Sequence, residues 1–125
     1  MIMTGHEIGK WVYEWSDGHY DEVACISLGQ IIDGRIKAGA VLTGWNGSSI
    51  QIHVRGHDDQ LYHEALRFAY EEIGAKKVLG YIDSSNVLAQ RFAKRFGFKQ
   101  EAKIENAGPK DDLLIFTKAR IDLGG

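Results

Sequence analysis

Five residues that can transfer protons or bind metal ions lie close together in this chain: His53, His57, Asp58, Asp59 and His63. Histidine titrates near neutral pH, so it is suited to accept a proton from a reacting group. A metal site needs three or four ligands that converge with fixed geometry, and these five residues follow no known ligand spacing. We therefore predict no metal site and regard His53 as the candidate for proton transfer.

Three cations, Arg91, Lys94 and Arg95, are spaced so that they share one face of a helix. Such a face either binds an anionic group or is simply solvated. Cys25 lies in an apolar segment without an activating neighbour, so we predict a core residue and not a nucleophile. A single cysteine cannot form an intramolecular disulfide, which favours a reducing, cytoplasmic location.

The composition indicates one domain spanning residues 1–125, with 44% hydrophobic and 26% charged residues. A formal net charge of -2 gives no general attraction to nucleic acid. Apolar runs are too short to cross a bilayer, and the first nine residues lack the blocks of a signal peptide. We therefore predict no membrane partner and no strong nucleic-acid signal.

The first element expected is an amphipathic helix beginning near Gly5. Thr4 and Glu7 have the spacing of a capping box, and a turn at residues 16–18 would end the helix. Its apolar residues recur with helical periodicity and predict a buried stripe: Ile8, Trp11, Val12 and Trp15.

Strands are expected next, at residues 23–32, 35–43 and 49–55. Asp33-Gly34 between the first two predicts a tight hairpin, because both turn positions need positive φ. In the third strand, residues alternate in polarity, which places His53 on the face shared with Gln51 and Arg55.

The remaining elements are a helix at 60–73, a strand at 77–82, a helix after Asn86, and strands at 98–104 and 113–119. Asp58 or Asp59 would cap the first of these helices, and Gly74 would end it in a left-handed conformation. On the last helix we expect Leu88, Ala89, Phe92 and Phe96 to form the buried face. The alternation of helices and strands predicts one mixed α/β domain.

An asparagine opens the last helix, an alanine follows three residues later, and Gly-Phe follows the helix: Asn86, Ala89, Gly97 and Phe98. In order and spacing this pattern resembles the second signature of the GNAT (GCN5-related) N-acetyltransferases, and the resemblance covers roughly residues 23–119. It implies a GNAT-like α/β fold, with a mixed, mostly antiparallel sheet and a central splayed pair of parallel strands flanked by helices.

A narrower resemblance is to short GNAT-like proteins encoded by tailed bacteriophages. Three local motifs carry it: Gly9-Lys10-Trp11-Val12, Ile52-His53 and Ser84-Ser85-Asn86.

The GNAT resemblance implies acetyl-CoA as co-substrate and an amine as acceptor. The main chain of residues 52–54 (Ile52, His53 and Val54) would bind the pantetheine arm, and Arg55, Gly56 and His57 would begin a pyrophosphate loop at the start of the following helix. Asn86 would contact the cofactor or order its helix, and Arg91 would meet the 3′-phosphate. His53 would act as base or water-positioner, or else as a hydrogen-bonded structural histidine.

The sequence departs from the family pattern at two places. The usual Gln/Arg-x-x-Gly-x-Gly/Ala loop has one glycine here, and it contains Asp58 and Asp59, whose charge repels phosphate. Either the loop is an altered phosphate site, or CoA binds weakly or not at all. Ala93 stands where many members carry a tyrosine that protonates the leaving thiolate.

Two functions of different class follow from these observations. The first is an acetyl-CoA-dependent N-acetyltransferase acting directly on a small molecule, a protein amine or a modified nucleotide. The second is a catalytically weak or inactive GNAT-like binding module, such as a phage protein that binds or inhibits a host protein. The partners would then be acetyl-CoA and an amine in the first case, and a host protein or a second copy of the chain in the other.

Overall fold

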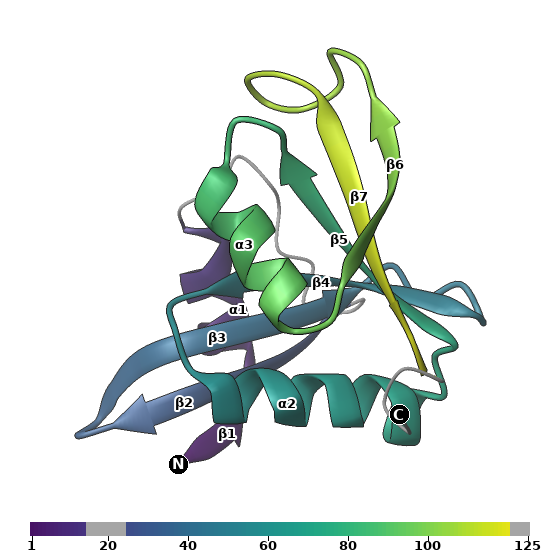
Figure 1. Ribbon diagram of the computed structural model, residues 1–125. Coiled ribbons are helices and arrows are strands. Elements are labelled where there is room, and N and C mark those ends of the chain that lie inside the picture. The colour runs from purple at the N-terminus through teal and green to yellow at the C-terminus, as the bar shows by residue number, and fades with distance from the viewer. Residues whose placement is uncertain (15–24, 121–125) are drawn as a thin grey trace.

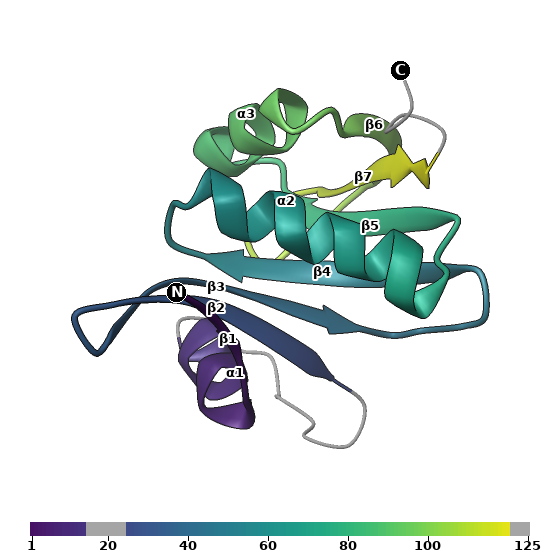
Figure 2. The same ribbon diagram turned by 90° about the horizontal axis from the view of Figure 1, so that it is seen from below.

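A seven-stranded sheet in the order β1-β2-β3-β4-β5-β7-β6 forms the centre of the computed structural model (Figure 1). The structure describes residues 1–14 and 25–120. All neighbouring strands are antiparallel except β4 and β5, which are parallel. Helix α1 covers one face of the sheet, and α2 and α3 lie on the other (Figure 2). This arrangement confirms the predicted fold class.

The chain begins with a short strand that the sequence did not predict. Strand β1 (Ile2–Thr4) pairs with β2, and Thr4 lies opposite Leu28. Helix α1 (His6–Tyr13) follows with Gly5 as its N-cap and without a side-chain cap. The capping box predicted for Thr4 and Glu7 is therefore wrong, because sheet pairing holds Thr4 one position before the cap. Trp15 and the turn predicted at residues 16–18 lie outside the described residues.

The hairpin predicted at Asp33-Gly34 joins β2 (Ile26–Ile32) to β3 (Arg35–Thr43). Both turn residues have positive φ, 52° at Asp33 and 75° at Gly34, which matches the right-handed twist of the strands. Strand β4 (Ser49–Arg55) follows a turn in which the Asn46 side chain accepts backbone hydrogen bonds.

The helix predicted at residues 60–73 has two parts. Helix α2 (Asp59–Arg67) continues as a π-helix, η1 (Phe68–Ile73), and Gly74 ends it with φ 89°, as expected for a left-handed cap. Within η1 the buried Tyr70 hydroxyl donates to the Lys118 carbonyl of β7 at 2.5 Å. The end of this helical segment is thereby anchored to the opposite half of the sheet.

The last four elements are β5 (Lys77–Asp83), α3 (Val87–Arg95), β6 (Lys99–Ile104) and β7 (Leu113–Ala119). Helix α3 meets α2 through its second half, where Phe92 and Phe96 contact the Tyr62 ring. Leu88 in the first turn is 76% exposed, so its predicted place in the buried face is wrong. The reason is that the first turn of α3 lies before these contacts with α2.

The main core lies between the sheet and α2, with residues such as Leu42, Ile50 and Leu61. A smaller cluster beneath α1 contains Val12, Val41 and Cys25. Cys25 is buried, as predicted for a core residue. Among the described helices, none is both long enough and apolar enough to span a membrane.

Candidate functional site

The two parallel strands part after a short contact. Strands β4 and β5 pair at three positions only, Ser49 with Lys77, Ile50 with Val78 and Gln51 with Leu79. Beyond that point β4 continues along β3, and β5 continues along β7. Among the described strands, the remaining residues of β4 (52–55) therefore have a pairing strand on one side only. The predicted splay is confirmed, and it leaves main-chain groups that a peptide-like arm can pair with.

His53 lies on the face of β4 that α1 covers. It is opposite Val41 of β3, and the centroid of its half-buried ring is 5.3 Å from that of Tyr13. Burial lowers the pKa of His53 below its ordinary value of 6.5, because the charged imidazolium is poorly solvated there. The ring is therefore neutral at pH 7, the form that can accept a proton.

The neighbours of His53 along β4 face the α2 side of the sheet. Ile52 packs against the main core, whereas the Val54 side chain is 43% exposed beside the part of β4 that β5 has left. The main chain of β4 and the exposed side chain of Val54 thus lie side by side where β4 and β5 diverge.

Arg55 turns towards α1. Its guanidinium donates to the Trp11 carbonyl at 2.8 Å, stacks 3.9 Å from the centre of the Trp11 ring, and lies 3.5 Å from the Glu14 carboxylate. The charged side chain of Arg55 therefore binds on the α1 face of the sheet. Towards the following loop, Arg55 presents its main-chain carbonyl group.

Gly56 continues the chain with φ 87° and lies tightly against β3. A Cβ here would overlap the Lys37 carbonyl oxygen and lie 2.9 Å from the Ala38 Cα. The Tyr62 hydroxyl donates to the Gly56 carbonyl at 2.5 Å and to the Arg55 carbonyl at 3.2 Å. Contact with β3 and Tyr62 therefore fixes this loop.

Tyr62 and Glu64 both lie on α2 but differ in their exposure. Tyr62 is 2% exposed, and its burial, followed by the nearby Asp58 charge, raises the pKa of the phenol. Glu64 is partly exposed and forms an ion pair with Arg67 at 2.5 Å. Tyr62 has a structural role in the loop, and Glu64 lies within a surface ion-pair group.

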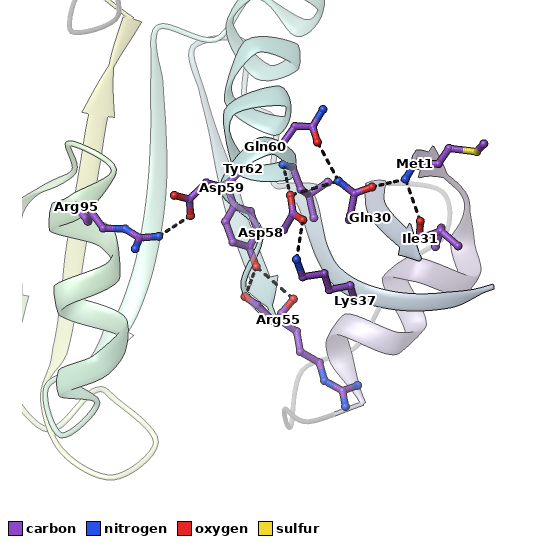
Figure 3. A network of polar contacts seen from close by, with 12 residues as sticks. Met1, Gln30, Ile31, Lys37, Arg55, Asp58, Asp59, Gln60, Tyr62 and Arg95 are labelled. Atoms are coloured by element: carbon purple, nitrogen blue, oxygen red, sulfur yellow. Dashed lines mark hydrogen bonds and ion pairs between the residues drawn. The ribbon is translucent and has the colours of Figure 1, made fainter. Parts of the chain in front are cut away.

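Asp58 caps α2, which resolves the choice between Asp58 and Asp59. Its carboxylate accepts the Leu61 N–H at 2.8 Å, lies 3.5 Å from the Lys37 ammonium, and is 3.4 Å from the Gln30 amide nitrogen (Figure 3). Asp59 is the first helical residue.

A contact between α2 and α3 lies beside the N-terminal end of α2. The Asp59 carboxylate pairs with the Arg95 guanidinium at 2.5 Å (Figure 3). That guanidinium lies 5.4 Å from the centre of the Phe92 ring. The exposed His57 ring is 6.0 Å from Phe92 in an edge-on arrangement. The loop after β4 is therefore linked to α3 by rings and by one ion pair.

On α3 itself, the Asn86 side chain accepts the Ala89 N–H at 3.1 Å and so caps the helix. This is the helix-ordering role proposed for Asn86 from the sequence. Arg91 is exposed, as is Lys94, and Ala93 offers no polar side-chain atom.

An open pocket of about 320 Å³ lies at the carboxyl end of β5. Its lining residues are Asp83, Ser85, Asn86, Pro109 and Lys110. The Asp83 carboxylate accepts hydrogen bonds from Ser85 and from the Lys110 and Asp111 N–H groups, and these bonds lower the pKa of Asp83. Asp83 thereby fixes the loop between β6 and β7 against the turn that carries Asn86.

His53 is part of the divergent strand β4, whereas Asn86 and the exposed Arg91 belong to α3 and its cap. The structure adds three residues that the sequence did not indicate: Tyr13 beside His53, Lys37 beside Asp58, and Asp83 in the loop contacts near Asn86. Each of these contacts joins distant segments, for which no local pattern exists. Within residues 1–14 and 25–120, no three His, Cys, Asp or Glu side chains form a group that could hold a metal ion.

No protein-family model matches the sequence, and no curated protein matches it. Solved structures do match. A spermidine N-acetyltransferase chimera of Vibrio cholerae SpeG and hSSAT has a TM-score of 0.79 at 10% identity, covering 99% of each chain. A GNAT family acetyltransferase from Elizabethkingia anophelis with acetyl-CoA bound has a TM-score of 0.67 at 14% identity, covering 78% of this chain and 77% of that one.

A provisionally assigned acetyltransferase from Acinetobacter baylyi ADP1 has a TM-score of 0.66 at 19% identity over 76% of this chain. The present chain spans 63% of that longer one. The parallel strand pair, its splay and these likenesses lead to one conclusion: the chain has the fold of the GNAT acetyltransferases.

Proposed function

We propose that this protein is an N-acetyltransferase that transfers an acetyl group directly from acetyl-CoA to an amine. The divergence of β4 from β5 carries the proposal. It presents the main chain of residues 52–54, along which the amide-containing pantetheine arm can lie as an additional strand.

In the reaction, the amine nitrogen forms a bond to the thioester carbonyl carbon, and the carbon–sulfur bond breaks. The amine loses one proton and the leaving sulfur gains one, so an amide and a thiol are the products. His53 is neutral at pH 7 and can accept the amine proton, directly or through water. Because Ala93 offers no acidic group, the thiolate receives its proton from water or from another group.

The candidate acceptors are a small amine, a protein amine and a modified nucleotide. The structural likeness to a spermidine N-acetyltransferase places polyamines among the amines to be tried first. The predicted contacts of Arg55, Gly56, His57 and Arg91 with the nucleotide half of CoA remain predictions, as does a contact of Asn86 with the cofactor.

Thiol release with an amine panel tests the proposed function. The panel contains polyamines, amino acids and lysine peptides, with acetyl-CoA or acetyl-pantetheine as donor, and mass spectrometry identifies an acetylated amine. We expect release that depends on both amine and protein. Absence of release with every amine and both donors would contradict the proposal.

The rival function is a weakly active or inactive GNAT-like binding module. The carboxylates at the start of α2 and the absence of a hydroxyl at Ala93 favour it. An origin in a bacteriophage, a host-protein partner, a homodimer and a cytoplasmic location all remain predictions from the sequence. If no thiol is released, copurification with host proteins becomes the informative experiment.

A further inference from the structure

The start of α2 is the place where a GNAT fold offers backbone N–H groups to a diphosphate. Here the side chain of the cap residue already uses one of them, because the Asp58 carboxylate accepts the Leu61 N–H at 2.8 Å. An anion bound at a helix start is stabilised by the free N–H groups and the helix dipole. In this chain the anion at the helix start is the carboxylate of Asp58.

The Asp58 carboxylate is held firmly in this position. Its side chain is 9% exposed and contacts Lys37 of β3 and Gln30 of β2 (Figure 3). Burial by itself would raise the pKa of Asp58, but the hydrogen bonds from Leu61 and Gln30 and the Lys37 charge lower it below the ordinary value. The group is therefore negatively charged at neutral pH.

Two cations at this helix end are each paired with a carboxylate. Lys37 contacts Asp58, and Arg95 contacts Asp59. Arg55, the first residue of the expected loop, has its guanidinium on the α1 face against Trp11. A diphosphate entering here would approach two carboxylates and would compete with them for Lys37 and Arg95.

Packing explains why a glycine occupies position 56, without any role in phosphate binding. Its positive φ and the close approach of the Lys37 carbonyl both require a residue without a side chain. The glycine is thus explained by packing against β3, and the loop does not fit a diphosphate in the manner of the family.

The pantetheine half of acetyl-CoA, in contrast, does fit the structure. The main chain of residues 52–54 has lost β5 as a neighbour, and the Val54 side chain is 43% exposed beside it. Building on the proposed function, we infer that this protein recognises its acyl donor by the pantetheine arm and not by the diphosphate. The substrate class is therefore pantetheine thioesters in general, and CoA is one member of it.

A comparison of donors tests the inference on the unaltered protein. Acetyl-pantetheine carries the same arm and thioester as acetyl-CoA but no phosphate. We expect kcat/KM values for the two donors within about threefold of each other. A preference of about a hundredfold or more for acetyl-CoA would overturn the inference while supporting the proposed function. No thiol release from either donor would overturn the proposed function, and the inference with it.

Pantetheine also occurs on carrier proteins, attached through a single phosphate. Acetylated acyl carrier protein is therefore the third donor. A kcat/KM at least equal to that of acetyl-pantetheine would identify carrier proteins as the source of the arm. A kcat/KM far below it would identify small-molecule thioesters as the source, and either result is consistent with recognition through the arm.

A charge-removing variant provides a second test. Asp58→Asn keeps an oxygen for the Leu61 N–H, since asparagine is an equally good cap, but it removes the negative charge. We expect the KM for acetyl-CoA to fall about tenfold, while the KM for acetyl-pantetheine stays within about twofold. Asp33→Asn is the matched control, because it removes one carboxylate at a distant hairpin turn where asparagine also accepts positive φ. An unchanged KM for acetyl-CoA in a folded Asp58→Asn protein would count against the inference.

Discussion

His53 combines two properties that a base in amine acylation needs. It is placed on the strand along which the thioester arm would lie, and burial keeps it neutral at pH 7. The ring of Tyr13 lies beside it, with a distance of 5.3 Å between the two ring centroids. The same burial makes protonation of His53 unfavourable in the folded protein, so its chemistry and its stability effect are linked.

We expect His53→Gln to lower kcat by a factor of about 10²–10⁴ with little change in donor KM, because a general base acts in the transition state. His63→Gln is the matched control, since His63 is exposed on α2, which lies on the other side of the sheet from α1 (Figure 2). Steady-state rates of thiol release measure both. A His53→Gln rate equal to that of the unaltered protein would remove His53 from the mechanism.

The pH dependence of stability follows from the same residue. The folded pKa of His53 is below its unfolded value, so the unfolded chain binds more protons between these two values. The stability present above about pH 6.5 should therefore decrease as the pH falls towards the folded pKa. Urea unfolding between pH 8 and pH 5 measures this decrease. It should be smaller in His53→Gln, and an identical profile in both proteins would contradict the assignment.

At the scale of elements, the loop after β4 is positioned by packing on both sides. Gly56 lies against β3, and the buried Tyr62 of α2 donates to two loop carbonyls. Asp58 then starts α2 while contacting β2 and β3. These contacts fix the loop although it lies at the surface, so a substitution there changes stability as well as any ligand contact.

Two glycines with similar φ separate the effect of backbone conformation from the effect of close packing. Gly47→Ala, at φ 93° with nothing within 4 Å of the new Cβ, should reduce the free energy of unfolding by about 1 kcal/mol. Gly56→Ala, at φ 87° against the Lys37 carbonyl, should cost about 1–3 kcal/mol more because the loop must also move. Chemical denaturation measures both values. Equal losses would show that the approach of β3 is not restrictive.

At the scale of the whole molecule, three residue pairs join the two parallel strands of the sheet. Strands β1 to β4 lie on one side of this junction, and β5, β7 and β6 lie on the other (Figure 1). Helix α2 and η1 pack along the sheet, and Tyr70 anchors their end to β7. The divergence of these two groups of strands leaves the main chain of β4 without β5 as a neighbour beyond residue 51.

Hydrogen exchange should detect the open edge. In residues 52–54, the amides that point away from β3 should exchange faster than the amides at positions 49–51, because only the latter segment is paired with β5. Saturating acetyl-pantetheine should slow those amides and leave the β2–β3 hairpin unchanged. Full protection of the edge in free protein, or no change on adding ligand, would contradict the proposed binding mode.

Local structure was largely predictable from the sequence. The hairpin at Asp33-Gly34, strands β3, β4 and β7, the left-handed Gly74 and the Asn86 cap all depend on a few neighbouring residues whose φ, hydrogen bonds or alternation are restricted. The order of elements and the helix signature together also predicted the GNAT-like architecture with its splayed strands. For the candidate site, the sequence predicted His53 and the main chain around it, and these assignments remain predictions; it also revealed the conflict between acidic residues and phosphate.

Only the tertiary structure decided what these groups contact. It directed the Arg55 guanidinium to Trp11, buried Tyr62, exposed Leu88, paired Thr4 in β1, and joined Lys37 to the Asp58 carboxylate. Each of these outcomes depends on which distant segments pack together, and many packings satisfy the same local pattern. The conformation of a turn is encoded by the residues within it, whereas the partner of a charge or a ring is chosen by the whole fold.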